Sequence, residues 1–432
     1  MVPVMRYIPL PGIPAPVRFP MTPVREPERF IRIPIVNNLI QPVASTSMHI
    51  TLVINYSDRR ISGGPQGVAY DTVEGLKKNH RRLEKDDIHI HIMSSLGTRL
   101  HAEFRSDEHQ GNITYEYFKK IVPTAFFSDF NYYLHLKKHK KTTDLLHSHP
   151  ISGATAGSFL GIPTLFTLHG MYWKEMLYDP GLYSKFAYGE LNVRRFKYLS
   201  RRVKKLIAIS PYVVGEVGRF LKTGIPEIEV IENPISDGFF GQEKHEKEGL
   251  ILYPASISPL KNQCTLVEAL YRLHQDHIPF HCIMPGPVAD YGYYRKLQTL
   301  IHTRGLDKDI TLPGPASLEQ MLSLYAEAGI MVITSRQETA PLIISEAMAT
   351  GTPVIASRVS GIPYMVSEGN SGLLINPLDP LEISDKIRMV LDDDSLRKRF
   401  GTESRRIAVS RWKSDIITNK LLDLYLQQVT GG

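Results

Sequence analysis

The chain has 432 residues, a formal net charge of +7 and only two cysteines, Cys264 and Cys282. This length exceeds what one hydrophobic core usually holds and predicts two domains, while two cysteines exclude a disulfide framework and favour a reducing compartment. The most apolar stretch, residues 151–168, is interrupted by Pro163, so the sequence has no run of about eighteen apolar residues and predicts a soluble protein without a membrane-spanning helix.

The first 47 residues differ in composition from the rest of the chain. They hold 10 of the 30 prolines and show little periodicity, which predicts a disordered or extended segment. Their arginines are scattered among the prolines and do not precede an apolar run, so a secretory signal peptide is not expected. A strand is predicted to begin directly at Met48, which makes Met48 a second candidate for the start of translation.

Residues 48–245 alternate apolar strands with helical stretches, the pattern of a parallel sheet covered on both faces. Strands are predicted at Ile50–Ile54, Ile88–Met93, Leu145–His147, Leu165–Leu168 and Leu206–Ile209. A glycine-rich turn, Ser62–Gly67, follows the first strand and precedes a helix predicted over Val68–Lys77. Amides at Gly63 and Gly64 could approach a phosphate closely, although an ordinary turn explains these glycines equally well.

Three polar side chains follow the later strands of this domain: His149, His169 and Ser210. Ligands of open α/β sheets bind beyond the carboxyl ends of the strands, so these residues are candidates for a binding site. His147 and His149 alternate along one strand in the manner of a metal pair, but the sequence offers no third ligand. Packing at the strand end is the better interpretation of this pair.

A second α/β run begins after the charged segment 241–249, and we place the boundary between the two domains at residues 245 and 246. Strands are predicted at Leu250–Tyr253 and Phe280–Met284, with a helix at Thr265–Gln275 between them. This second domain is expected to span residues 246–410, and residues 411–432 to form a last helix around Ser414–Gln428. The turns Pro285–Pro287 and Pro313–Pro315 follow strands and are candidates for the lining of a nucleobase pocket.

The most informative stretch is Thr334–Gly351, which sets Glu338 and Glu346 eight residues apart. Pro341 suits the first position of a helix and the final glycine suits the position after its end, so a helix is predicted over Leu342–Thr350. This helix is apolar on nearly every side and should be buried, and its single charge, Glu346, therefore requires a partner. A paired-carboxylate glycosidase is disfavoured, because eight helical residues span about 12 Å, more than the roughly 5 to 9.5 Å between the carboxyl groups of such enzymes.

Glu338 and Glu346 match the Glu-x7-Glu motif of the retaining glycosyltransferases of family GT4, and the chain resembles that family over much of its length. The similar stretches are Glu346–Val366, Gly369–Asp379, Asp144–Pro150, Thr167–Gly170 and Ala208–Tyr212. The resemblance implies an α/β protein of the GT-B type, in which two Rossmann-like domains face each other across a cleft. It also implies that the C-terminal helix crosses back to the first domain.

The resemblance assigns roles to individual residues. Glu346 would bind the ribose hydroxyls of a nucleotide, Glu338 the transferring sugar, and His169 would lie beside that sugar. His169, Lys261 and Glu338 are the candidate catalytic residues. The further candidates for binding the donor are Gly63, Gly64, Ser256, Ala340 and Leu342.

One position departs from the family. Members usually carry an arginine five residues before the lysine that matches Lys261, and together the two cations hold the diphosphate, but Ser256 stands at the arginine position. A charge-assisted contact to phosphate contributes about 1.5 to 3 kcal/mol, so its loss would weaken donor binding or leaving-group stabilisation. The arginines that could replace it are Arg59, Arg60 and Arg336.

The function implied is a hexosyltransferase that moves a sugar from a nucleoside diphosphate, with UDP and GDP as the favoured nucleotides, to a hydroxyl of a glycan, a lipid-linked or a small-molecule acceptor. The anomeric configuration would be retained, with no metal and no cofactor. Asp392–Asp394 has the form of a DxD metal motif, but a helix cap and turn explain it better. Two alternatives stay open: a nucleotide-sugar epimerase or hydrolase on the same fold, and a catalytically silent nucleotide-sugar-binding subunit.

Charge suggests how the protein meets its acceptor. A basic, aromatic-laced stretch could contact an anionic membrane surface, where each lysine or arginine adds about 1 kcal/mol, although a solvated helix face is the simpler interpretation. The residues concerned are Arg194, Arg195, Lys197, Arg201, Arg202, Lys204 and Lys205. We expect a cytoplasmic protein, peripheral on the inner face of the membrane, and no nucleic-acid partner, since no base-reading module is present.

Overall fold

The computed structural model describes residues 47–56, 64–96, 109–119, 128–175 and 189–431. All but the last residue of the predicted N-terminal extension, and also Gly63, lie outside these ranges. None of the helices within them combines the length and the apolar character that crossing a bilayer demands.

The first sheet has eight strands in the order β3-β4-β2-β1-β5-β6-β7-β8. All neighbours pair in parallel except β3, which runs antiparallel to β4 at one edge. The strands are β1 (Met48–Val53), β2 (Ile88–Leu96), β3 (His109–Gln110), β4 (Ile113–Lys119), β5 (Leu145–Ser148), β6 (Thr164–Leu168), β7 (Lys205–Ala208) and β8 (Ile228–Val230). The five strands predicted for this domain are therefore confirmed.

Helices connect the parallel strands of this sheet, as a parallel crossover requires. They are α1 (Gly64–Lys78), α2 (His80–Lys85), α3 (Ser128–His139), α4 (Ile151–Leu160), α5 (Tyr172–Glu175), α7 (Leu191–Leu199) and α8 (Pro211–Leu221). The short helix α9 (Asp237–Phe240) follows the last strand and packs into the core of the second half. Strands β1, β5 and β6 are buried almost throughout, which is why they read as continuous apolar runs.

The second sheet has six strands in the order β11-β10-β9-β12-β13-β14, all parallel. This is the strand order of a Rossmann fold. The strands are β9 (Leu250–Leu252), β10 (His281–Ile283), β11 (Ile310–Thr311), β12 (Ile330–Ile333), β13 (Val354–Ser357) and β14 (Gly372–Ile375). Its helices are α10 (Gln263–Gln275), α11 (Tyr291–Thr303), α12 (Leu318–Glu327), α13 (Leu342–Ala349), η3 (Ile362–Tyr364), α14 (Pro380–Leu391) and α15 (Asp394–Arg411).

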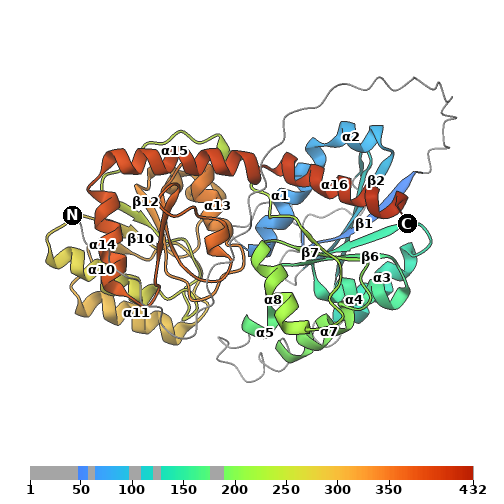
Figure 1. Cartoon of the computed structure of the whole chain (residues 1–432), viewed down its shortest axis with the longest axis horizontal. Helices are drawn as coiled ribbons and strands as arrows, with labels where there is room; N and C mark the ends of the chain where they lie inside the picture. Colours follow the sequence, from blue (N-terminus) through green and yellow to red (C-terminus); the bar gives the residue numbers. More distant parts are fainter. Residues whose placement is uncertain (1–46, 57–63, 97–108, 120–127, 176–188, 432) are drawn as a thin grey trace, which may run out of the picture. The chain divides into compact units, whose positions relative to one another are not determined.

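The chain thus forms two Rossmann-like α/β halves, each with its own sheet and helices, as predicted (Figure 1). One large apolar cluster fills the second half, whereas three smaller clusters fill the first. The predicted residue boundaries of the domains stay predictions.

The last helix, α16 (Ser414–Thr430), packs against α1 of the first half (Figure 1). Leu421, Leu422 and Tyr425 are buried in the same cluster as Val73 and Leu76 of α1. The predicted crossing of the C-terminal helix back to the first half is therefore confirmed.

Gly75 allows α1 and α16 to approach closely. A Cβ atom at this position would lie 2.6 Å from Thr418 Cγ2 and 2.8 Å from the carbonyl oxygen of Ser414. Both distances are shorter than van der Waals contact, and the carbonyl belongs to the backbone of α16. A larger residue must therefore move the helix.

Gly75→Ala is expected to lower the free energy of unfolding by about 1 to 2 kcal/mol, because the overpacking exceeds the gain in helix propensity. Gly215→Ala is the matched control: Gly215 also lies within a helix, α8, and a Cβ atom there would meet nothing within 4 Å. It should stabilise the protein by about 0.5 to 1 kcal/mol. Chemical denaturation of the two variants measures both effects, and equal effects would show that the α1–α16 contact is not close.

Candidate functional site

A cavity of about 460 Å³, here called the cleft cavity, is lined by residues of both halves. Chain order reverses between β1 and β5 in the first sheet and between β9 and β12 in the second. Loops that follow such strands border the crevice in which α/β proteins bind ligands. Gly64 after β1, Lys261 after β9 and Glu338 after β12 all line the cavity.

Asn262 ties together the two loops that carry Lys261 and Glu338. Its backbone has a φ of +60°, a left-handed conformation that asparagine tolerates better than most residues. Its side-chain amide donates to the carbonyl oxygens of Thr334 at 3.2 Å and Pro377 at 2.7 Å. The Arg336 amide adds a bond of 2.9 Å to the Leu260 carbonyl oxygen. Because these bonds link the loops after β9 and β12, Lys261 and Glu338 are held opposite each other.

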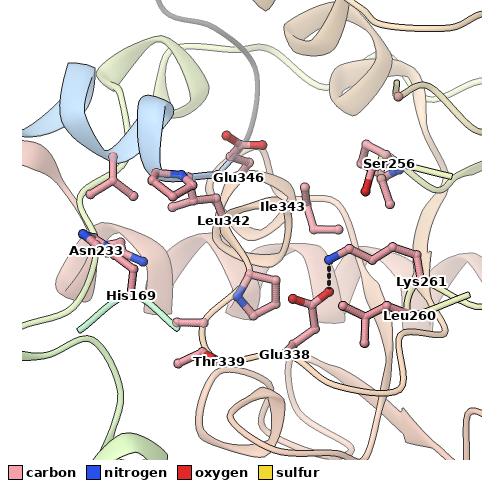
Figure 2. A pocket seen from close by; sticks show the side chains of 18 of the residues that line it. His169, Asn233, Ser256, Leu260, Lys261, Glu338, Thr339, Leu342, Ile343 and Glu346 are labelled. Carbon is pink, nitrogen blue, oxygen red and sulfur yellow. Dashed lines mark hydrogen bonds and ion pairs between the residues drawn. The ribbon is translucent and has the colours of Figure 1, made fainter. Parts of the chain in front are cut away.

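Lys261 Nζ donates a hydrogen bond to Glu338 Oε1 (Figure 2). The Lys261 side chain is 21% exposed and that of Glu338 11%, so the ion pair is largely shielded from water and faces the cavity. The two residues to which the family resemblance assigns the phosphate and the sugar are thus in direct contact.

A glycine packs directly behind Glu338. The Gly361 amide donates to the Glu338 carbonyl oxygen at 3.0 Å. A Cβ atom at Gly361 would lie 1.7 Å from the Thr339 carbonyl oxygen. Only glycine fits this contact, and it fixes the backbone that presents Glu338.

Glu346 is buried, with an exposed fraction of 3%, and its carboxylate lines the cleft cavity from α13. Its Oε2 accepts a hydrogen bond of 3.0 Å from the hydroxyl of Tyr325 on α12. The predicted helix is confirmed to within one residue, and Gly351 follows it with a φ of +75°. The placement of Pro341 was wrong: it is the N-cap with an extended ψ of 120°, and Leu342 begins the helix. The proline ring fixes only φ, which suits both positions.

Three neighbouring histidines, His147, His149 and His169, lie next to one another, and of these only His169 lines the cavity. His169 Nε2 lies 2.7 Å from His149 Nδ1. His147 lies within 2.6 Å of the Tyr425 hydroxyl and 2.7 Å of the Thr167 hydroxyl. Both ring nitrogens of His147 are thus engaged by protein, which favours packing at the strand end over a metal pair.

Burial governs the charge of these histidines. It lowers the pKa of His169 to about 4, and burial with the neighbouring His169 lowers the pKa of His147 to about 3. Burial also lowers the pKa of His149, with smaller effects from the other two rings. All three imidazoles are therefore neutral near pH 7, and His169 meets a ligand as a hydrogen-bonding group without charge.

The sequence did not reveal Glu175, a third carboxylate at the cleft cavity. Its Oε1 accepts a hydrogen bond of 3.1 Å from the Met171 amide. The pKa of Glu175 is raised, chiefly by burial and in addition by the nearby Glu338 charge. The Met171 amide and the Lys261 charge oppose this shift but do not cancel it. The only signal in the sequence is its place six residues after His169, which indicates nothing by itself.

The remaining predicted residues are placed as follows. Gly64, Ser256, Ala340 and Leu342 line the cleft cavity, whereas Gly63 lies outside the described residues. Of the two proline turns, Pro285–Pro287 lines the cavity, and no residue of Pro313–Pro315 is part of its lining. The aspartates of Asp392–Asp394 cap and flank α15, where Asp393 accepts from the Leu396 amide.

None of the three arginines proposed to replace the missing cation is seen at the cavity. Arg59 and Arg60 lie outside the described residues. Arg336 lines a separate pocket, and its guanidinium donates to Asn262 Oδ1 at 3.2 Å. Lys261 is therefore the cation that the described residues bring to the cleft cavity.

Two residues of the predicted membrane-contacting stretch were assigned wrongly. Arg195 is 7% exposed and pairs with Asp129, and Lys205 is 2% exposed and pairs with Glu227. The ammonium of Lys205 and the guanidinium of Arg195 are therefore directed to these carboxylates and present almost no surface to a membrane. Exposed side chains are found at the other five positions, Arg194, Lys197, Arg201, Arg202 and Lys204.

Comparison with known proteins gives the same assignment in both halves. The family model "Glycosyltransferase Family 4" matches residues 76–238, and "Glycosyl transferases group 1" matches residues 236–407. An uncharacterized glycosyltransferase of Methanocaldococcus jannaschii is 24% identical over 79% of this chain and 91% of its own length. A D-inositol 3-phosphate glycosyltransferase of Corynebacterium efficiens is 40% identical, but over 28% of this chain; the matched part is 27% of that protein.

Solved structures share the fold. Sucrose-phosphate synthase from Thermosynechococcus elongatus superposes with a TM-score of 0.71 at 19% identity, covering 89% of this chain and 100% of that one. Anabaena HepE, solved in complex with UDP and glucose, has a TM-score of 0.65 at 19% identity, with 87% and 99% covered. With its two halves matched by adjoining glycosyltransferase models and its GT-B fold, the chain belongs to the glycosyltransferases of family 4.

Proposed function

We propose that this protein is a retaining glycosyltransferase that transfers a hexose from a nucleoside diphosphate to an acceptor hydroxyl without a metal. The observation that carries the proposal is the cleft cavity, which is lined by Glu346 of α13 and, from loops that follow strands of both sheets, by the Lys261–Glu338 pair and His169. A cavity of this size fits a small ligand with a few convergent polar groups.

Each group has a task that fits its surroundings. The Glu346 carboxylate, oriented by Tyr325, accepts hydrogen bonds from the two ribose hydroxyls. Glu338 accepts from hydroxyls of the sugar, and the neutral imidazole of His169 bonds the same sugar from the other half.

Charge stabilisation explains how these residues would catalyse transfer. When the bond between sugar and diphosphate breaks, negative charge grows on the β-phosphate. Lys261 and the first amides of α13, near Ala340 and Leu342, would stabilise that charge, because amides at a helix start have no partner within the helix. The Gly64 amide would contribute from the opposite half.

UDP-sugars are the favoured donors. Anabaena HepE has been solved in complex with UDP and with UDP-glucose, and its similarity in fold makes a uridine donor the first to test here. Pro285–Pro287 lies in the same cavity and would contact the base. GDP-sugars are the second choice.

A panel of UDP-, GDP- and ADP-sugars, assayed for release of the nucleoside diphosphate with and without acceptors, tests this function. A transferase should release it faster when a suitable acceptor hydroxyl is present. The proposal would be overturned if no donor bound and no donor released its nucleoside diphosphate. Equal release without an acceptor would instead indicate a hydrolase or epimerase.

Two observations keep the alternatives in view. Glu175 supplies a further carboxylate to the cleft cavity, the feature that hydrolysis or epimerisation would need. If the protein is a hydrolase or epimerase, Glu175→Gln should abolish turnover without an acceptor. If it is a transferase, the same variant should retain turnover with an acceptor. The other observation is Ser256, which stands where the family usually carries a phosphate-binding arginine and so favours a silent subunit. Such a subunit would bind the donor and never release the nucleoside diphosphate.

Ser256→Arg is expected to tighten donor binding about tenfold to 150-fold, because a charge-assisted contact to phosphate contributes about 1.5 to 3 kcal/mol. Ser256 lines the cavity with Lys261. Calorimetric titration with a UDP-sugar measures the gain, and Ser256→Gln, which adds length without charge, is the control. An equal change in both variants would show that charge at this position is unimportant.

For the acceptor, we propose a carbohydrate or lipid-linked hydroxyl, reached by peripheral contact of the five exposed cations with an anionic membrane. Replacing Arg201, Arg202 and Lys204 by glutamine should weaken cosedimentation with anionic vesicles about 100-fold, since each cation adds about 1 kcal/mol. The matched control replaces Lys137, Lys138 and Lys140, which are exposed at the end of α3 and just beyond it. If the unaltered protein does not bind anionic vesicles at low salt, the proposed membrane contact is wrong.

A further inference from the structure

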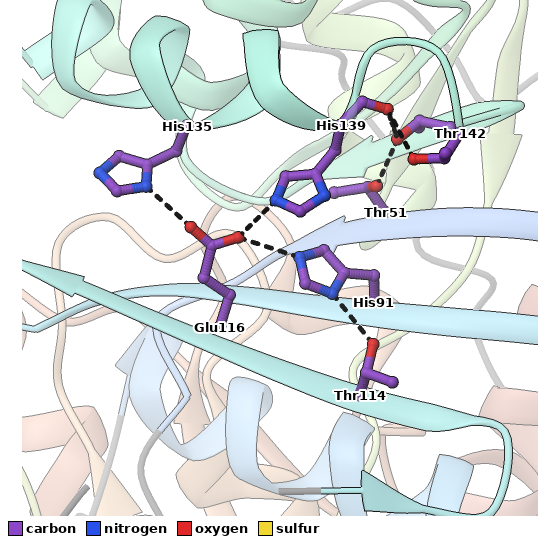
Figure 3. Close-up of polar contacts among 8 residues, drawn as sticks. Thr51, His91, Thr114, Glu116, His135, His139 and Thr142 are labelled. Carbon is purple, nitrogen blue, oxygen red and sulfur yellow. Dashed lines mark hydrogen bonds and ion pairs between the residues drawn. The ribbon is translucent and has the colours of Figure 1, made fainter. Parts of the chain in front are cut away.

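A cluster of three histidines and one glutamate lies in the first half, apart from the cleft cavity (Figure 3). Glu116 of β4 is central to it. Its Oε2 lies 2.7 Å from His139 Nε2 and 3.2 Å from His91 Nε2, while its Oε1 lies 2.8 Å from His135 Nδ1. None of the four residues lines the cleft cavity.

Three separate elements bring these side chains together. His91 on β2 pairs in register with Thr114 on β4, and Glu116 follows two residues later on the same face of the sheet. α3 carries His135 and His139 one helical turn apart, so both reach the same carboxylate. The four side chains are between 16% and 33% exposed, which leaves them shielded but reachable from solvent.

We propose that His91, Glu116 and His139 bind a divalent transition metal of the zinc type. Their ligand atoms all lie within 4.8 Å of one another. Two ligands at about 2.0 to 2.1 Å from a tetrahedral zinc ion are about 3.3 Å apart, so small rotations of the side chains are enough to form the site. Two imidazoles and one carboxylate are ligands that this class of metal prefers over calcium or magnesium.

The surroundings support the three ligands in the way that metal sites require. The other ring nitrogen of His91, Nδ1, lies 3.0 Å from the Thr114 hydroxyl, which can either donate or accept and thus permits the tautomer with a free Nε2 lone pair. His135 bonds the second oxygen of Glu116 and would orient the carboxylate from outside the metal's own ligands.

A pocket beside the proposed ligands leaves room for a fourth ligand. His91 and His139 line a pocket of about 250 Å³, which also includes His49 and His89. Water or an exchangeable ligand could therefore complete a tetrahedron. A bound ion would tie the β2–β4 strand pair to α3 and would stabilise the first half without entering the transfer reaction.

Equilibrium dialysis and calorimetry with zinc test the site, using the full chain without a histidine tag and after treatment with a chelator. We expect about one zinc ion per chain and a higher melting temperature with zinc. His91→Gln and His139→Gln should each weaken zinc binding more than about 100-fold, and His135→Gln about 10- to 100-fold, the range typical of an outer ligand. His89→Gln is the matched control, because His89 lies on the same strand and lines the same pocket but pairs with Asp87. The zinc affinity of this variant should not change.

The unaltered protein provides a measurement that does not depend on the folding of variants. Cobalt added in place of zinc should produce the visible absorption of a four-coordinate ion. Failure of the unaltered protein to bind either metal would overturn the proposal. Unchanged zinc binding by the combined His91→Gln and His139→Gln variant would overturn it as well.

Discussion

Glu346→Ala is expected to lower kcat/KM for the donor sugar by about 10²- to 10⁴-fold. In the proposed function its carboxylate accepts hydrogen bonds from two ribose hydroxyls, and each charge-assisted bond contributes about 1.5 to 3 kcal/mol. Glu346 is the single charged residue of α13 and is 3% exposed, so water would replace the lost acceptor poorly. Most of the loss should fall on KM for the donor, measured with saturating acceptor.

Tyr325→Phe is the matched control for this prediction. It removes the hydroxyl that donates to Glu346 at 3.0 Å and keeps both the ring and the carboxylate. A neutral hydrogen bond contributes about 0.5 to 1.5 kcal/mol, so kcat/KM should fall by about tenfold or less. If the alanine variant were no worse than the phenylalanine variant while both remained folded by circular dichroism, Glu346 would not bind the donor.

Local signals in the sequence were sufficient to predict the scaffold of this site. The helix α13 follows from an apolar run that starts after Pro341 and stops before Gly351, and both residues act through their own backbone preferences. The strands β1, β5, β6 and β7 are short, buried apolar runs, which is the signature of a parallel sheet. Elements with such signals do not depend on distant residues.

Contacts made over long sequence separation could not be predicted in the same way. Tyr325 is 21 residues before Glu346. The two side chains meet only in the folded second half, where Tyr325 of α12 reaches Glu346 of α13. Glu116 lies 25 residues from His91 and 23 from His139. The register of β2 against β4 brings His91 to it, and the position of α3 brings His139. Arg195 and Lys205 likewise pair with Asp129 and Glu227, which are distant along the chain. The basic stretch alone therefore predicts an exposed surface and does not indicate that two of its cations are buried in ion pairs with these carboxylates.

Lys261→Ala is expected to lower kcat by about 10²- to 10³-fold with a much smaller change in KM for the donor. Negative charge on the β-phosphate increases as the sugar leaves, so an ammonium group beside it stabilises the transition state more than the bound donor. Removal of one such preorganised donor typically costs this much in kcat. The described residues bring no arginine to the cavity, and therefore Lys261 should carry more of this stabilisation than it would beside a second cation.

Single-turnover measurement of sugar transfer is the appropriate assay, because it isolates the chemical step from product release. Lys247→Ala controls for the loss of a positive charge, since Lys247 pairs with Glu327 at the surface of the same half. Glu338→Ala removes the partner that holds Lys261 in the ligand-free protein, so combining it with Lys261→Ala in a double-mutant cycle measures their coupling. If Lys261→Ala raised KM but left the single-turnover rate unchanged, Lys261 would bind the donor equally in the ground state and in the transition state. The amides at the start of α13 would then have to stabilise the charge of the leaving group.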